Sequence, residues 1–236
     1  TLASVQTQEF RSFEVIVVDD GSTDGTENVV RQFPGIRFVR QSNSGPGAAR
    51  NAGGAKARGR YVAFLDSDDL WFPWTLQNYW VALENYDAAF ISGTGLEFCD
   101  SYCPSPDASK PSFRLYRDYF EAGAVGRWVG TCGVAIERLA FLRSGGFIGG
   151  NVNAEDSDLW LKLGEVSPFV VVDSPYSFAY RRSPESATGN LSRTVRGLRC
   201  VLDAERCCRY PGRKLRRRER QRIIGAHVRP LCVACI

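Results

Sequence analysis

Two clusters of carboxylates are the residues of this 236-residue sequence that are best suited to chemistry. They are the pair Asp19-Asp20 and the run Asp66-Ser67-Asp68-Asp69. Mg²⁺ and Mn²⁺ prefer hard oxygen ligands and take one or two protein carboxylates beside phosphate oxygens and water. The spacing of Asp66 and Asp68 therefore predicts a divalent-metal site, because alternate residues of an extended segment point the same way. Such pairs are also common in loops and helix caps, so the surrounding elements decide how much weight this one carries.

Each acidic cluster directly follows an apolar run that is typical of a buried strand, over residues 13–18 and 61–65. Between these runs the sequence predicts a helix, a strand and a helix, over residues 26–33, 36–39 and 48–58. This alternation is typical of a parallel sheet with crossover helices. Ligands bind beyond the carboxyl ends of the strands in such sheets. We therefore expect both acidic clusters to face one crevice.

The rest of the chain predicts further elements of both kinds. Helices are expected over 73–85, 138–143 and 154–163, and strands over 87–93, 131–136, 169–172 and 176–180. Residues 99–112 are typical of a loop, and the chain from residue 192 onward is typical of helix with a break near Pro211-Gly212. The fold class that follows is α/β, with a mostly parallel mixed sheet flanked by helices and a helical C-terminal tail.

The composition is that of an ordinary globular protein, with 44% hydrophobic and 24% charged residues. No run of about 18 apolar residues predicts a membrane-spanning helix, and no signal peptide is recognisable at the N-terminus. We expect a cytoplasmic protein. The eight cysteines are expected to be reduced thiols. The pairs Cys99/Cys103 and Cys232/Cys235 lie too far apart in the sequence to predict a four-ligand zinc site.

Charge is distributed unevenly along the chain. Residues 193–236 hold thirteen Arg and Lys against three Asp and Glu, whereas the remainder is acidic overall. Two interpretations are open: an Arg-rich helix that is merely solvated, or a tail that meets an anionic surface, either phospholipid or nucleic acid. The second interpretation predicts peripheral contact with the inner face of a membrane.

Four segments resemble family 2 glycosyltransferases of the GT-A fold. They occur in the family's order, over residues 14–26, 43–53, 59–71 and 155–162. The resemblance extends over roughly residues 1–185. It implies a glycosyltransferase domain over 1–190 and a basic extension over 191–236. The family usually begins with a strand that lines the nucleotide pocket, whereas Thr1 falls in the helix that should follow it, so we expect the domain to be N-terminally truncated.

The resemblance implies an inverting, metal-dependent transfer from a nucleotide-diphosphate sugar, with UDP as the expected nucleotide, to a hydroxyl of a saccharide or lipid-linked acceptor. Asp20, Arg50, Asp66 and Asp68 match the family's donor-binding residues. Asp68, with Asp66, matches the ligands of the Mg²⁺ or Mn²⁺ ion, while Asp69 is expected to cap the next helix. The same resemblance implies a role in polysaccharide biosynthesis for the cell envelope.

Asp156 matches the family's catalytic base, which takes the proton of the acceptor hydroxyl. Glu155 and Asp158 compete with it for that role. All three carboxylates would also favour a helix N-terminus through its dipole, without any catalytic role. Trp160 could stack on a sugar, but within Leu159-Trp160-Leu161 it is more typical of core.

Three other functions stay open at this point. One is a nucleotide-sugar-binding protein without transferase activity, and another is a sugar nucleotidyltransferase of similar fold. The third is a nucleic-acid-binding module, suggested by the basic tail alone. An acidic crevice disfavours nucleic acid, because a phosphate backbone requires Lys and Arg there.

Overall fold

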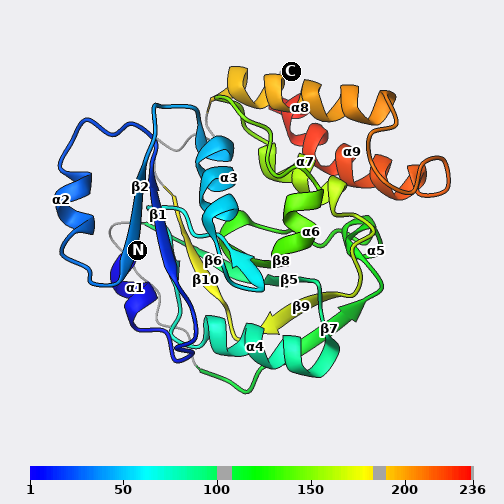
Figure 1. Cartoon of the computed structure of the whole chain (residues 1–236). Coiled ribbons are helices and arrows are strands. Elements are labelled where there is room, and N and C mark those ends of the chain that lie inside the picture. Colours follow the sequence, from blue (N-terminus) through cyan, green and yellow to red (C-terminus); the bar gives the residue numbers. More distant parts are fainter. Residues whose placement is uncertain (100–107, 183–189, 235–236) are drawn as a thin grey trace.

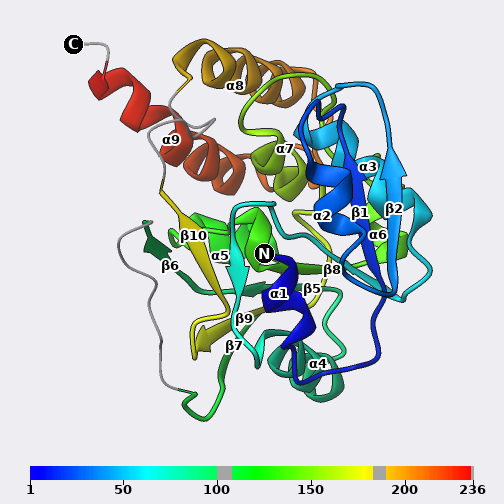
Figure 2. The ribbon, with the colours of Figure 1, turned by 90° about the vertical axis from the view of Figure 1, so that its left-hand side faces the viewer.

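The computed structural model describes residues 1–99, 108–182 and 190–234, with side chains described up to residue 228. Mixed β-sheets are flanked by helices, as Figures 1 and 2 show. The strands are β1 (Val15–Asp19), β2 (Ile36–Arg40), β3 (Tyr61–Ala63), β4 (Leu70–Trp71), β5 (Phe90–Gly93), β6 (Gly95–Phe98), β7 (Ser112–Tyr116), β8 (Val134–Glu137), β9 (Phe169–Ser174) and β10 (Phe178–Arg181). The helices are α1 (Leu2–Gln6), α2 (Thr26–Val30), α3 (Pro46–Lys56), α4 (Thr75–Tyr86), α5 (Tyr119–Ala124), the 3-10 turn η1 (Thr131–Gly133), α6 (Arg138–Arg143), α7 (Glu155–Lys162), α8 (Leu191–Arg206) and α9 (Arg217–Ala234).

A five-stranded sheet in the order β3-β8-β5-β9-β7 forms the centre of the molecule. Its strands alternate apolar side chains between two faces, as the twofold period of a strand requires. Phe90 of β5 packs beneath α5, α6 and α7, whereas its neighbour Ile91 packs against Tyr79 and Ala82 of α4. The middle strands β8, β5 and β9 are therefore buried on both faces, which explains why they are largely apolar without a polar alternation.

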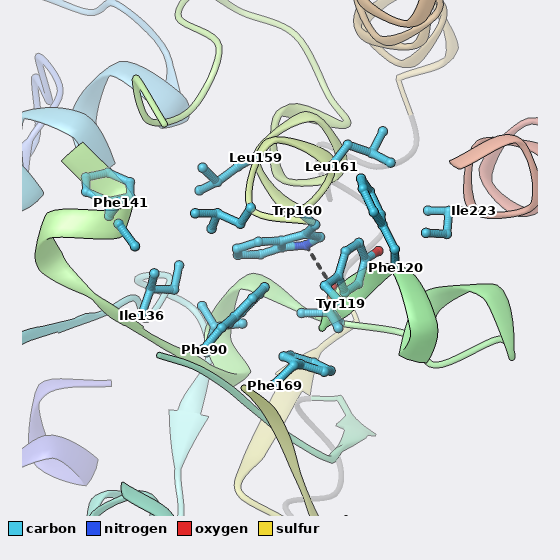
Figure 3. Close-up of a cluster of buried hydrophobic side chains, with 14 of the residues drawn as sticks. Phe90, Tyr119, Phe120, Ile136, Phe141, Leu159, Trp160, Leu161, Phe169 and Ile223 are labelled. Atoms are coloured by element: carbon cyan, nitrogen blue, oxygen red, sulfur yellow. Dashed lines mark hydrogen bonds between the residues drawn. The ribbon is translucent and has the colours of Figure 1, made fainter. Parts of the chain in front are cut away.

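The larger core surrounds Trp160, which lies between α7 and the sheet (Figure 3). Its ring centroid lies 5.3 Å from that of Phe90 and 6.2 Å from that of Phe147. The indole N–H donates a hydrogen bond of 3.2 Å to the carbonyl of Val129, so the polar atom of this buried ring is satisfied. Trp160 is thus a core residue, as its apolar neighbours indicate, and not a sugar-stacking one.

The first three strands do not form one sheet, which corrects the prediction from their alternation with helices. β1 pairs with β2 in parallel, from Val15 opposite Ile36 to Asp19 opposite Arg40. β3 pairs antiparallel with β8 in the central sheet instead. Helix α3 packs on β1 and on α6 and so spans the two sheets (Figure 1). Alternation along the chain predicts strands and helices, but the pairing partner is decided by tertiary packing.

The α/β class with mixed sheets flanked by helices is confirmed, and antiparallel pairings are more numerous than the sequence predicts. β8 runs antiparallel between β3 and β5, and β7 runs antiparallel to β9. The short elements β4, β6, β7 and α5 were not predicted, because two to six residues carry too little periodicity to be recognised. Most of the loop predicted over 99–112 lies outside the described residues, and its end belongs to β7.

The C-terminal helices α8 and α9 pack against α5 and α7 and not away from the rest (Figures 1 and 2). Val201 and Ala204 of α8 and Ile223 and Ile224 of α9 belong to the same buried cluster as Trp160. The helical character of this segment is confirmed, and its buried stripe explains why it stays helical despite its charge. The division of the chain at residue 190 stays a prediction.

Removing the Trp160 side chain should cost more stability than any exposed truncation. We expect Trp160→Ala to lower the free energy of unfolding by about 3–5 kcal/mol, because it leaves a cavity between α7 and the sheet. Trp160 is 1% exposed, whereas Trp128 is 64% exposed and provides the matched control. Urea denaturation followed by circular dichroism measures both variants. Equal losses in the two variants would contradict the central position of Trp160.

Candidate functional site

The acidic run after β3 forms a turn and not an extended segment, which corrects the prediction from alternate spacing. The backbone N–H of Asp69 donates a 3.1 Å hydrogen bond to the carbonyl of Asp66, three residues earlier. This turn leaves the Asp68 side chain exposed and directs Asp69 into the interior. Asp66 is therefore the first residue of a turn, Asp68 is one of its two central residues, and Asp69 points inward.

Asp69 is fully buried and does not cap the following helix, contrary to the expectation from sequence. One carboxylate oxygen accepts a 2.8 Å hydrogen bond from the backbone N–H of Arg181. The other accepts a hydrogen bond from the thiol of Cys132. Side-chain atoms of Asp66, Asp69 and Cys132 lie within 4.8 Å of one another. Within the described residues this is the group whose ligand atoms lie close enough together to hold a metal ion.

Burial governs the protonation of this group. It raises the pKa of Asp69 to about 6, against the hydrogen bonds from Cys132 and Arg181, which lower it. Burial also raises the pKa of the Cys132 thiol, and the carboxylates of Asp66 and Asp69 raise it further. The thiol therefore stays protonated and serves as a donor to Asp69, and the group carries less negative charge than its composition suggests.

Arg50 joins two parts of the site that are far apart in the sequence. From helix α3, its Nη2 lies 2.6 Å from Oδ1 of Asp66, and its Nη1 lies 2.7 Å from Oε1 of Glu155. The Arg50 side chain is only 14% exposed, and its guanidinium lies 5.3 Å from the ring centroid of Phe147. The acidic run after β3 and the acidic start of α7 are thereby brought to the same place.

The acidic start of α7 is only partly accessible. Burial raises the pKa of Glu155 and of Asp156, and each carboxylate also feels the other charges of the site. Asp156 is affected by both Arg50 and Asp66, so it lies within electrostatic reach of the acidic run after β3. Ala154, just before the helix, has φ of 63°, and backbone strain in a non-glycine residue is concentrated at functional sites.

Asp158, the third carboxylate of α7, has a structural environment. It is buried, its Oδ1 accepts a 2.8 Å hydrogen bond from the Tyr210 hydroxyl, and Nζ of Lys162 lies 2.6 Å from its Oδ2. The side chain therefore fastens α7 to the segment after α8. This geometry favours Asp156 or Glu155 over Asp158 as a group that meets a ligand.

The two carboxylates after β1 hold the loops around them. Asp19 is buried, and hydrogen bonds from Ser22 lower its pKa. Asp20 accepts hydrogen bonds from the side chain of Gln41 at 2.7 Å and from the backbone N–H groups of Ser44 and Gly45 at 2.9 and 2.8 Å. Asp20 thus fixes the loop that leads into α3, the helix that carries Arg50.

That loop is also closely packed against the segment before α7. The N–H of Gly150 donates a 3.1 Å hydrogen bond to the carbonyl of Ser44. A Cβ at Gly45, whose φ is 89°, would lie 2.2 Å from the carbonyl oxygen of Gly150. Only glycine fits here, so the Gly45-Pro46-Gly47 turn allows α3 and the α7 segment to approach each other.

Cys132 is the site residue that sequence reasoning did not identify. It belongs to η1, and its carbonyl accepts a 2.6 Å hydrogen bond from the indole of Trp71. No spacing relates it to the acidic run, since 63 residues separate it from Asp69. Among the other cysteines with described side chains, Cys200, Cys207 and Cys208 form no disulfide. Cys103 and the Cys232/Cys235 pair lie outside the described side chains.

The sequence of this chain matches a model of a known protein family. The model described as glycosyl transferase family 2 matches residues 1–134, which is more than half of the chain. The chain belongs to glycosyl transferase family 2. The matched region holds both acidic clusters, Arg50 and Cys132, and family membership favours a glycosyltransferase over a sugar nucleotidyltransferase.

No helix among the described residues has the length and hydropathy needed to cross a membrane.

Individual relatives support the assignment. An uncharacterized glycosyltransferase of Rickettsia felis is 28% identical over 183 residues, covering 75% of this chain and 29% of that protein. TuaG of Bacillus subtilis, named for teichuronic acid biosynthesis, is 46% identical over 76 residues, which is 30% of each chain. The chain thus spans less than a third of these curated relatives.

The fold agrees with a solved structure of the same kind. The crystal structure of S. aureus TarS 1–349 in complex with UDP-GlcNAc has a TM-score of 0.76 to this chain, at 18% identity. The match covers 96% of this chain and 66% of that one. At this identity the likeness establishes the GT-A fold.

The raised pKa of Asp69 predicts a pH-dependent stability. A buried carboxyl whose folded-state pKa is near 6, above its ordinary 3.8, favours folding while it is protonated and loses that advantage as pH rises through 6. Compared with Asp69→Asn, wild-type protein should lose about 2 kcal/mol of unfolding free energy between pH 4 and pH 7. Urea titrations in EDTA at four pH values measure this difference. Parallel pH profiles of the two proteins would be inconsistent with the buried environment of Asp69.

Proposed function

We propose that this chain is the catalytic domain of an inverting glycosyltransferase that uses a nucleotide-diphosphate sugar, with UDP as the nucleotide. The observation that carries the proposal is the double ion pair of Arg50 with Asp66 and Glu155. It links the acidic run on the donor side with the acidic start of α7 on the acceptor side. A transferase needs both within one site, because the acceptor oxygen must attack the donor's anomeric carbon directly.

On the donor side we assign four residues. Asp20 and Arg50 bind the nucleotide part of the donor, and Asp66 and Asp68 lie at the diphosphate. The support for Asp20 is its place at the carboxyl end of β1, where ligands of α/β sheets bind. Its hydrogen bonds to Ser44 and Gly45 would keep the loop in position around the base.

The donor set of the acidic run fits Mg²⁺ or Mn²⁺. Both oxygens of Asp69 are engaged by Arg181 and Cys132, which leaves Asp66 and Asp68 as the hard oxygen donors. One or two protein carboxylates are what such an ion takes when phosphate oxygens complete its shell. A bound ion would stabilise the negative charge that grows on the leaving diphosphate. The carboxylates of this chain would hold it at the end of β3.

On the acceptor side we assign Asp156 as the base and Glu155 as its supporting partner. Burial raises the pKa of Asp156, which brings it closer to the range in which a carboxylate can accept a proton from a hydroxyl. Glu155 is held by Arg50 and so is less free to accept that proton. The acceptor is a saccharide or a lipid-linked sugar, and a basic C-terminal segment next to an anionic membrane would favour the lipid-linked class.

Substituting Asp68 tests the metal site. We expect Asp68→Ala to bind UDP with about the same affinity whether or not Mn²⁺ is present, whereas wild-type protein binds at least about tenfold more tightly with Mn²⁺. Isothermal titration with UDP, with and without Mn²⁺, measures this. Asp87→Ala, which removes an exposed carboxylate after α4, is the control and should behave as wild type. Retained Mn²⁺ dependence in Asp68→Ala would rule out this assignment.

Substituting Asp156 separates binding from transfer. Asp156→Asn should keep its affinity for UDP within about twofold and release UDP from UDP-GlcNAc about 10²–10⁴-fold more slowly, because the base is lost. Glu165→Gln, just beyond the C-terminal end of α7, is the matched control and should retain the wild-type rate. Equal loss of UDP affinity in Asp68→Ala and Asp156→Asn would show that the two residues do not divide the roles. A wild-type chain that binds UDP without releasing it from any donor would instead be a nucleotide-sugar-binding protein.

A further inference from the structure

The turn between α8 and α9 is held firmly by buried polar contacts. Arg216 donates two hydrogen bonds to the carboxylate of Asp118, at 2.7 and 2.8 Å. Nε of Arg220 lies 2.6 Å from Oε2 of Glu205, and its Nη1 donates to the carbonyl of Pro211. Together with the bond from Tyr210 to α7, these contacts fix the turn on the body of the domain.

The held turn presents one apolar side chain to solvent. Leu215 is 92% exposed, more than any other large apolar side chain in the described part of the chain. The backbone around it is bent by positive φ angles of 53° at Cys208, 75° at Gly212 and 40° at Arg213. Two of these residues are not glycine, so the anchoring contacts must sustain a strained turn. Strain of this kind persists where the surrounding structure requires the conformation.

Exposed cations lie on either side of Leu215 in the turn and along α8 and α9. A hollow of about 470 Å³ lies between α8, the turn and α9, and a second of about 290 Å³ lies along α9. Their basic lining residues have exposed side chains: Arg206, Arg213, Lys214, Arg217, Arg218 and Arg222. The larger hollow also has an apolar floor, to which Leu202, Ile224 and Val228 contribute. We call these six cations with Leu215 the basic surface.

Among the described residues, acidic side chains neutralise little of the basic surface. Arg206 lies 3.4 Å from Asp203, and the other five cations form no ion pair there. Glu205, the acidic residue among those lining the hollows, is paired with the buried Arg220. Glu219 is paired with Arg216, which also binds Asp118. The arginines of the segment therefore divide into two that build the turn and a set that remains exposed. This division argues against an Arg-rich helix that is merely solvated, since solvation alone does not require a locked turn with a protruding leucine.

We propose that the basic surface docks on an anionic phospholipid membrane, with Leu215 inserted among the lipid tails and the cations at the headgroup phosphates. Each Lys or Arg near an anionic leaflet adds to binding, and long cationic side chains keep their charge at the interface while their stems pack on apolar groups. Nucleic acid would use the cations but not the exposed leucine or the apolar floor. Membrane docking itself does not depend on the proposed function. Only its use, which is to bring the domain to a lipid-linked acceptor, rests on that function.

Vesicle co-sedimentation at 0.15 M salt tests the docking surface. Wild-type protein should partition to vesicles of phosphatidylcholine with 30% phosphatidylserine and not to pure phosphatidylcholine. The quadruple variant Arg213→Gln, Lys214→Gln, Arg217→Gln, Arg218→Gln should bind at least about 100-fold more weakly, since four interfacial cations are lost. Leu215→Ser keeps every charge and should bind about tenfold more weakly, since one apolar insertion is lost.

Matched controls keep the test specific. The variant Arg11→Gln, Arg31→Gln, Arg37→Gln, Arg58→Gln removes four exposed arginines near β1 and β2, on the side of the molecule away from α9 (Figures 1 and 2). It should bind vesicles as wild type does. Leu139→Ser removes an exposed leucine from α6 and should also have no effect. All variants should retain UDP binding with Mn²⁺, because none of the substituted residues is assigned to the donor site.

Several outcomes would overturn the inference. Wild-type protein that binds UDP but not the anionic vesicles would reject the docking surface and leave the proposed function intact. Equal losses in the two quadruple variants would show a response to net charge alone. Unchanged vesicle binding by Leu215→Ser, together with binding of single-stranded DNA that the α8–α9 quadruple variant loses, would assign the surface to nucleic acid. Vesicle binding by a chain that does not bind UDP would reject the proposed function alone.

Discussion

The ion pairs of Arg50 are the interaction on which the rest of the site depends. Burial lowers the pKa of this guanidinium, but the carboxylates of Asp66 and Glu155 raise it, and the net direction is upward. A buried cation is tolerated only with such partners, and a buried carboxylate equally needs its cation. The three side chains come from α3, the turn after β3 and the start of α7. Their mutual requirement fixes these three segments relative to one another.

Helix α7 connects the site to the remainder of the fold. Its first turn carries Glu155 and Asp156, and its apolar side contributes Leu159, Trp160 and Leu161 to the core. Asp158, also on α7, accepts a hydrogen bond from the hydroxyl of Tyr210. One short helix thus ties together the candidate base, the packed centre and the C-terminal helices.

The cysteine and carboxylate group shows how tertiary packing changes the role of a residue. Within Asp66-Ser67-Asp68-Asp69 the three carboxylates look equivalent, but the turn separates them into an ion-paired, an exposed and a buried one. Asp69 accepts hydrogen bonds from the backbone of β10 and from the thiol of Cys132 instead of capping a helix. This could not be read from the sequence, because both partners lie more than 60 residues away.

The sequence by itself determined the local elements that are long enough to be periodic and the places where they end. Apolar runs specified β1, β2, β3 and β9, and Pro and Gly marked the limits of α3. The family motifs predicted the carboxylates and Arg50 as site residues. These features depend on neighbouring residues only. Tertiary structure decided the pairing of β3 with β8, the turn that buries Asp69, the partners of Arg50 and the exposure of Leu215. Each of these is settled by contacts between distant segments, which must compete for the same buried surface and the same charges.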